Sequence, residues 1–397
     1  MQNPKAIRIL VDFEDAFTIP TGIPTCLVND AICLILSGFD LILWYSDKAK
    51  TPQIYTWMGK YLNEEQQARI QLLNTRPRNI KMWIAQFIPW IFKQNITCDF
   101  SYASLFPRLP IEGHQRPLLR IYDPFGAHNS PLKTLFNTLF IGETIKNAMA
   151  RAIRTYGYIK LNKQDLVKIY ISGSTKKLCQ SIYRDSNPND LVIYPTVQFA
   201  VQELATKSTK STKSTKSTKS TKSNDLEPFF IFIGGQRQRK NPLSIINLWA
   251  ESLHLYKFNL VIVGSIEANK LSPALVKAIN IGRLKMVKNI SVEELRAQIE
   301  NSEGIVYNTL PDGFGYPIAE GIYLQKPVIC NDLEVFREIG GSYPYFFEIE
   351  NYAQALQILT DINDGNIVMT KELSKKFDLW NSVKNWQASL SSLKVIQ

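Results

Sequence analysis

Predicted strands and helices alternate along this chain, and this order limits its fold more than any other feature. The alternation is clearest in the second half. There, the expected strands and the helices that follow them are Phe229–Ile233 with Pro242–Leu253, Asn259–Val263 with Pro273–Ala278, and Gly304–Tyr307 with Ile318–Leu324. Strands joined by helices of this length form parallel sheets that are covered on both faces. The chain is therefore predicted to be α/β.

The first half shows the same order with weaker patterns. A strand at Ala6–Val11 leads to a loop that ends in Thr21-Gly22-Ile23-Pro24, and a helix over Thr25–Leu36 follows. The further strands expected in this half are Asp40–Trp44, Leu119–Tyr122, Lys168–Ile171 and Asp190–Tyr194. Because 397 residues exceed what one ordinary core accommodates, we expect two Rossmann-like domains with a cleft between them.

A low-complexity repeat separates the two halves. Residues 206–223 are six consecutive copies of Thr-Lys-Ser, which have no apolar side chain to bury and so cannot offset the entropy lost on ordering. We interpret the repeat as a solvated linker, and the alternative is a tether to an anionic surface. The expected boundaries are 1–200 for an N-terminal domain, 201–227 for the linker, 228–375 for a C-terminal domain and 376–397 for a final helix.

The positive charge of the chain is concentrated in this repeat. Removing its six lysines from the net charge of +11 leaves +5, which suits an anionic small molecule or a membrane surface as well as a nucleic acid. No pattern of interleaved aromatic and basic residues accompanies the charge, so nucleic acid is not an expected partner. The five cysteines lack paired spacing and there are only three histidines, so no zinc or iron–sulfur pattern can be drawn.

The sequence predicts a cytoplasmic protein. It enters a strand directly, without the layout of a signal peptide. Its longest apolar region, Ala31–Tyr45, is interrupted by Gly38 and Asp40 and is too short to span a bilayer. The aromatic segment Lys81–Lys93 allows two interpretations. It is a helix packed in the N-terminal domain, or it lies in a membrane interface on the cytoplasmic face.

The most informative short motif is Asp312–Glu320, a glycine-containing turn with one carboxylate at each end. It follows the expected strand Gly304–Tyr307 and opens the expected helix Ile318–Leu324. Loops between the carboxyl end of a strand and the N-terminus of a helix bind anionic ligands in α/β folds. Glycines allow the backbone to approach a ligand, and carboxylates accept hydrogen bonds from hydroxyl groups. The motif therefore indicates a nucleotide-sugar site.

Four blocks of the second half occur together in a specific order. They are Phe232–Asn241 with its Gly-Gly and Arg-Lys-Asn, Asn259–Gly264, Asp312–Glu320, and Lys326–Ile329 followed by Arg337–Gly341. This combination resembles the donor domain of retaining glycosyltransferases of family 4, mannosyltransferase-like enzymes with the GT-B fold. The resemblance implies two Rossmann-like domains whose parallel sheets face each other across a cleft. It also implies that the final helix crosses back to the N-terminal domain.

The resemblance assigns the donor phosphates to the first block. Lys240 and Arg239 would stabilise the charge on the diphosphate, while Gly234 and Gly235 allow close approach. The alternative is that these basic residues form a solvated loop before a helix. No metal and no other cofactor is expected, because basic side chains and a helix N-terminus neutralise the diphosphate.

The resemblance assigns the sugar and the ribose to the third block. Glu320 would accept hydrogen bonds from the ribose hydroxyls, and Asp312 would meet the donor sugar beside the backbone of Gly313, Phe314 and Gly315. The family usually has glutamate where Asp312 stands, and aspartate is one methylene shorter. For the Phe314 side chain, packing is the alternative role.

The first half matches the family less closely. Gly22 stands where the family has a glycine loop after the first strand, and Tyr122 stands in place of a histidine that faces the donor sugar. His128 is a second candidate for that role. Together these matches predict transfer of a hexose, with retention of configuration, from a nucleotide-diphosphate sugar to a glycan or lipid-linked acceptor. The alternative is a non-catalytic GT-B protein that binds a nucleotide or glycan.

Overall fold

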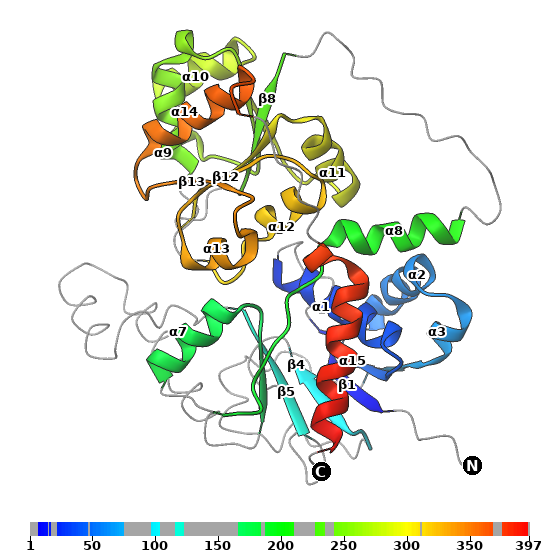
Figure 1. Ribbon diagram of the computed structural model, residues 1–397. Coiled ribbons are helices and arrows are strands. Elements are labelled where there is room, and N and C mark those ends of the chain that lie inside the picture. The colour runs from blue at the N-terminus through cyan, green and yellow to red at the C-terminus, as the bar shows by residue number, and fades with distance from the viewer. Residues whose placement is uncertain are drawn as a thin grey trace. The chain divides into compact units, whose positions relative to one another are not determined.

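The computed structural model divides the chain into two compact units (Figure 1). The first unit comprises Met1–Thr212 together with Asp378–Gln397, and the second comprises Lys213–Phe377. The structure describes residues 7–14, 16, 22–46, 48–74, 97–103, 116–122, 166–183, 187–209, 227–234, 242–309, 312–367 and 375–395. The segment Lys81–Lys93, His128, and the repeat beyond residue 209 lie outside these ranges.

The first unit is built on a sheet in which every described strand pair is parallel. The strand order is β3-β2-β1-β4-β5-β6-β7. The strands are β1 Arg8–Asp12, β2 Asp40–Trp44, β3 Ile70–Leu73, β4 Phe100–Ala103, β5 Arg116–Ile121, β6 Val167–Tyr170 and β7 Leu191–Val192. Chain order runs outward in both directions from β1 and β4, as in doubly wound folds.

Six α-helices of the described residues belong to this unit. They are α1 Gly22–Leu36, α2 Thr51–Tyr61, α3 Glu64–Ala68, α7 Gly173–Tyr183, α8 Gln198–Thr209 and α15 Leu379–Val395. Helix α8 extends into the range expected to be linker, because Phe199 and Val201 bury their side chains and fix its first turns. Helix α15 lies along α1 (Figure 1), and the Ser37 hydroxyl donates a hydrogen bond to the Val383 carbonyl oxygen over 2.8 Å.

A buried ion pair lies between the sheet of the first unit and these two helices. The guanidinium of Arg120, on β5, lies 3.3 Å from the carboxylate of Asp30, on α1, and their side chains are 0% and 2% exposed. The Tyr102 hydroxyl also donates to Asp30, over 2.5 Å. The buried ring of Trp386, on α15, lies 5.7 Å from the Arg120 guanidinium carbon. Burial opposes the charge on Arg120, but the Asp30 carboxylate together with Cys26, Tyr102 and Tyr122 outweighs this effect and raises the pKa of Arg120.

The second unit has its own parallel sheet, in the order β10-β9-β8-β11-β12-β13. The strands are β8 Phe229–Ile233, β9 Asn259–Val263, β10 Leu284–Val287, β11 Gly304–Tyr307, β12 Val328–Asn331 and β13 Tyr345–Phe347. The helices are α9 Pro242–Glu251, α10 Pro273–Asn280, α11 Val292–Asn301, α12 Tyr316–Tyr323, α13 Glu334–Gly340 and α14 Tyr352–Asn363. The central strand β8 is a continuous apolar run, and β9 is apolar after its first residue, Asn259, as expected for strands covered on both faces.

Local sequence signals set the helix starts in this unit. Ser291 and Glu294 form a capping box at α11, in which each side chain accepts a hydrogen bond from the other residue's backbone N–H. The Ser272 hydroxyl caps α10 in the same position, and Pro273 follows as the first helical residue.

The prediction of an α/β protein with parallel sheets is confirmed. Within the described residues, no helix has the length and apolar character needed to cross a membrane.

All five cysteines are reduced and buried, so none is paired in a disulfide. Burial raises the pKa of the Cys98 thiol to about 11 and raises those of Cys33 and Cys330 further. A buried thiol with a raised pKa is a poor nucleophile at neutral pH. The cysteines are therefore core residues.

Candidate functional site

The strand order of the second unit identifies one edge of its sheet as the place for a ligand. Strands β8 and β11 are neighbours, and the chain proceeds from them toward opposite ends of the sheet. Ligands of doubly wound folds bind beyond the carboxyl ends of the strands at such a switch point. Gly234 directly follows β8, and Asp312 lies in the loop after β11. The topology therefore brings these two predicted site segments to the same position.

Gly234 begins the loop after β8 in a conformation that favours glycine. Its φ is 133°, and its N–H donates to the Val263 carbonyl oxygen over 3.3 Å, which ties the loop to the end of β9. Gly235, Arg239 and Lys240 lie outside the described residues. Their assignment to the donor phosphates stays a prediction.

The carboxylate of Asp312 organises the loop between β11 and α12. One oxygen, Oδ1, accepts hydrogen bonds from the backbone N–H of Phe314 over 3.0 Å and of Gly315 over 3.1 Å. The other oxygen, Oδ2, accepts a hydrogen bond from the Tyr307 hydroxyl. Asp312 is half-buried. The residue predicted to meet the donor sugar thus also fixes the turn that carries it.

A second anchor holds the start of this loop. The side-chain amide of Asn331, at the end of β12, accepts from the Thr309 N–H over 3.1 Å and donates to the Thr309 carbonyl oxygen over 3.0 Å. Asn331 is fully buried. Neither Asn331 nor Tyr307 was predicted from the sequence, although a buried asparagine at the carboxyl end of a strand is a signal that could have identified the first.

Gly315 connects the loop to α12 and has little room for any side chain. Its φ is 86°, and a Cβ atom placed on it would lie 2.9 Å from the ring of Phe336. Left-handed backbone is costly for residues other than glycine. The glycine is therefore required by both its conformation and its packing.

We expect Gly315→Ala to destabilise the second unit by about 2–4 kcal/mol, from the left-handed backbone and the overlap together. Gly365 supplies the control, because its φ is 74° but no atom lies within 4 Å of an added Cβ. Gly365→Ala should cost only the backbone term, about 1–2 kcal/mol. Urea unfolding of the two variants measures the difference, and equal costs would show that the contact with Phe336 relaxes freely.

The remaining predicted residues of this loop occupy two different environments. The Phe314 side chain is 1% exposed and packs edge-on against Tyr316 and Phe377. Its ring therefore belongs to the core, and its backbone N–H shapes the turn. Glu320 lies on α12 and is 9% exposed, as is usual only for a carboxylate with partners. Gly313 is buried in the same turn.

The predicted residues of the first unit lie on different elements. Gly22 is the first residue of α1, which begins three residues earlier than expected. Tyr122 directly follows β5 and is 5% exposed, and burial beside Cys26 and Asp30 raises the pKa of its hydroxyl. The structure thus places Tyr122 in the same buried polar cluster as Arg120.

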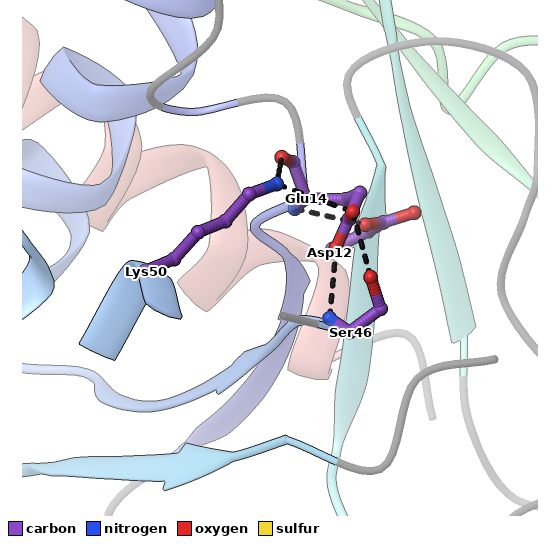
Figure 2. A network of polar contacts seen from close by, with 4 residues as sticks. All are labelled: Asp12, Glu14, Ser46 and Lys50. Atoms are coloured by element: carbon purple, nitrogen blue, oxygen red, sulfur yellow. Dashed lines mark hydrogen bonds and ion pairs between the residues drawn. The ribbon is translucent and has the colours of Figure 1, made fainter. Parts of the chain in front are cut away.

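The first unit also carries an ordered polar network after β1 and β2 (Figure 2). The Glu14 carboxylate accepts hydrogen bonds from the N–H and the hydroxyl of Ser46, both over 2.8 Å, and pairs with Lys50 over 3.1 Å. The carboxylate of Asp12, 6% exposed, accepts from the Glu14 N–H over 3.2 Å. The network fixes the chain at the carboxyl edge of the sheet.

Among the described residues of both units, no group of His, Cys, Asp and Glu side chains is arranged to hold a metal ion.

Comparison with known proteins agrees with this geometry. Residues 213–372, which contain both loops of the switch point, match the Glycosyl transferases group 1 family. The second unit is a glycosyl transferases group 1 domain. Residues 1–212 and 378–397, which precede and follow this domain, lie in the first unit, and residues 373–377 form the end of the second unit.

Relatives of known activity resemble parts of the chain. The serotype-specific mannosyltransferase WbdA of Escherichia coli is 29% identical over 146 residues, which are 34% of this chain and 17% of WbdA. The O-antigen chain mannosyltransferase RfbU of Salmonella typhimurium is 26% identical over 173 residues, which are 41% of this chain and 47% of RfbU. The chain thus spans less than half the length of either relative.

Solved structures extend the likeness beyond the group 1 domain. Anabaena HepE, in complex with UDP and glucose, has a TM-score of 0.63 at 13% identity, with 97% of this chain and all of HepE covered. WaaG, a glycosyltransferase involved in lipopolysaccharide biosynthesis, has a TM-score of 0.56 at 9% identity, with 97% of this chain and 95% of WaaG covered. The chain has the α/β fold of these GT-B glycosyltransferases.

Proposed function

We propose that this protein transfers a hexose, most simply mannose, from a nucleotide-diphosphate sugar to a glycan or lipid-linked acceptor of a surface polysaccharide. The observation that supports this proposal most directly is the pair of loops at the switch point of the group 1 domain. Gly234 and the Asp312–Glu320 loop lie together there, as a nucleotide-sugar site requires. The mannosyltransferases WbdA and RfbU suggest the sugar. The HepE complex with UDP-glucose supports the class of donor.

In this proposal, each loop binds a different part of the donor. Lys240 and Arg239 bind the diphosphate and stabilise the charge that develops on the leaving oxygen. The Glu320 carboxylate accepts hydrogen bonds from the ribose hydroxyls, and Asp312 meets the sugar. The N-terminus of α12 adds a favourable field for the phosphates. These groups neutralise the donor without a metal ion.

The reaction proposed is transfer with retention of anomeric configuration. The departing phosphate oxygen accepts the proton of the attacking hydroxyl of the acceptor, so no pair of catalytic carboxylates is required, in contrast to glycosidases. The contribution of the protein is to position the two substrates and to stabilise charge. We assign the acceptor to the first unit and the reaction to the cytoplasmic face of a membrane.

Binding and turnover measurements on the wild-type protein test this proposal. Calorimetry with GDP, GDP-mannose, UDP and UDP-glucose is expected to show binding of one nucleoside diphosphate and its sugar. Incubation of that sugar nucleotide with lipid-linked glycan acceptors should release the nucleoside diphosphate, and NMR of the product should show the anomeric configuration of the donor. An inverted product would contradict the retaining mechanism, and absence of binding to every nucleotide would contradict the function.

The second candidate is a non-catalytic protein that binds a nucleotide or glycan. It is favoured by the engagement of the shorter Asp312 carboxylate with its own loop and by the burial of Tyr122. Nucleotide-sugar binding without release of nucleoside diphosphate, across the same donors and acceptors, would support this alternative.

A further inference from the structure

Tyr307 connects the rigid sheet of the second unit to the carboxylate of Asp312. It is the last residue of β11 and is 2% exposed. Its ring packs against Phe336 with a centroid distance of 5.5 Å, and its hydroxyl donates to Asp312 Oδ2. Because the ring is packed and the strand is paired on both sides, the hydroxyl oxygen has a fixed position. The orientation of the Asp312 carboxylate is therefore set by the sheet.

The hydrogen bonds of Asp312 leave a defined position for a ligand. A carboxylate has about four acceptor positions, two on each oxygen. The N–H groups of Phe314 and Gly315 use those on Oδ1, and the Tyr307 hydroxyl uses one on Oδ2. The second acceptor position of Oδ2 can receive one hydroxyl group. Its direction depends on where Tyr307 holds the carboxylate.

We propose that Tyr307 is a positioning residue that directs Asp312 Oδ2 at one hydroxyl of the donor hexose. Asp312 then recognises the sugar through one hydrogen bond that Oδ2 accepts. The Tyr307 hydroxyl fixes the direction of this bond. The Tyr307 hydroxyl compensates for the shorter aspartate side chain, because it fixes Oδ2 while the loop N–H groups hold only Oδ1. This proposal rests on the proposed function and defines the sugar subsite of that donor site.

Because Asn331 anchors the start of the loop, the contribution of the Tyr307 hydroxyl can be measured separately from the stability of the loop. Asn331 holds the Thr309 backbone independently of the Tyr307 hydroxyl. The Asp312 Oδ1 contacts to Phe314 and Gly315 also remain when that hydroxyl is removed. Tyr307→Phe therefore preserves the ring packing and the Oδ1 contacts of the turn, and it removes the hydrogen bond that orients Oδ2. The contacts to the base, ribose and phosphates are unchanged.

The test compares a nucleotide sugar with the same nucleotide without its sugar. Tyr307→Phe is expected to weaken the binding of GDP-mannose by about tenfold, the effect of one hydrogen bond to a charged group. Its affinity for GDP should stay within about twofold of wild type. UDP-glucose and UDP serve in the same way if the wild-type protein prefers uridine. Calorimetry measures all four affinities.

Two further variants show whether the effect is specific. Tyr343→Phe removes a tyrosine hydroxyl that donates to the Lys326 carbonyl oxygen over 3.2 Å, before β12 at the opposite edge of the sheet. This control should leave both affinities unchanged. In an Asp312→Ala background, Tyr307→Phe should have no additional effect on GDP-mannose binding, because the hydroxyl acts through the carboxylate.

Three results would overturn the proposal. Equal weakening of GDP and GDP-mannose by Tyr307→Phe would show that the hydroxyl supports the whole loop, and unchanged affinities would show that it has no role in binding. An undiminished effect in the Asp312→Ala background would show that Tyr307 does not act through Asp312. Absence of nucleotide binding by the wild-type protein would instead overturn the proposed function together with this subsite.

Discussion

Arg120→Met is expected to destabilise the first unit by about 3–5 kcal/mol, because it leaves a buried carboxylate without its counter-charge. The Asp30 carboxylate would stay buried at 2% exposure without its cationic partner. The Tyr102 hydroxyl and the Cys26 thiol, which also donate to Asp30, are neutral and cannot compensate for a buried negative charge. The variant should therefore unfold at a urea concentration lower by about 1–2 M, given typical denaturant slopes for a unit of this size.

Two matched variants identify the cause of this loss. Replacing Arg120, Asp30 and Tyr102 together by apolar residues (Arg120→Met, Asp30→Leu and Tyr102→Phe) should recover much of the stability, because both buried charges are removed. Arg69→Met breaks the pair with Asp40, which is 35% exposed, and should cost only about 1 kcal/mol. Urea unfolding followed by tryptophan fluorescence compares the three proteins. A loss in Arg120→Met no larger than in Arg69→Met would contradict the buried-charge argument.

Glu320→Ala and Lys240→Ala are expected to reduce turnover of the nucleotide sugar by at least about 100-fold each. A charge-assisted hydrogen bond contributes about 1.5–3 kcal/mol, and each side chain is proposed to make more than one such contact with the donor. The effect of Lys240→Ala should fall mainly on the maximal rate, because charge grows on the phosphate in the transition state. Glu320→Ala should weaken ground-state binding of nucleotide and nucleotide sugar alike.

The control for these variants is a glutamate outside the proposed donor contacts. Glu334 is exposed in the first turn of α13, and Glu334→Gln should retain near-normal turnover. Thermal denaturation of each variant shows whether the fold is intact. Near-normal turnover in folded Glu320→Ala and Lys240→Ala proteins would contradict the donor site.

Sequence patterns predicted three strands of the second unit, β8, β9 and β11, because these strands are mostly apolar on both faces. The expected strands Phe229–Ile233, Asn259–Val263 and Gly304–Tyr307 have the observed bounds. The strands that were not expected, such as β3 and β4, are short and include polar residues, so their patterns are weak. The boundaries of α8 could not be predicted either, because its first turns are stabilised by packing against other elements.

Residues of the candidate site could be predicted from the sequence only where the residue type itself indicates a chemical role. Asp312, Gly315 and Glu320 could be selected because carboxylates and glycines next to a strand end have few other uses. Tyr307 was not predicted, because it looks like an ordinary strand residue until its hydrogen-bond partner across the loop is known, and Asn331 was not predicted although asparagine is uncommon in strands. Asp30 and Arg120 are separated by 90 positions in the chain, and only the fold brings them together.

The place of α15 in the first unit has a consequence for protein synthesis. The whole second unit, Lys213–Phe377, is synthesised before α15. Trp386 can therefore cover the Arg120–Asp30 pair only after the whole second unit has been synthesised. During elongation, the nascent first unit therefore lacks this cover over its buried charges until α15 has been synthesised.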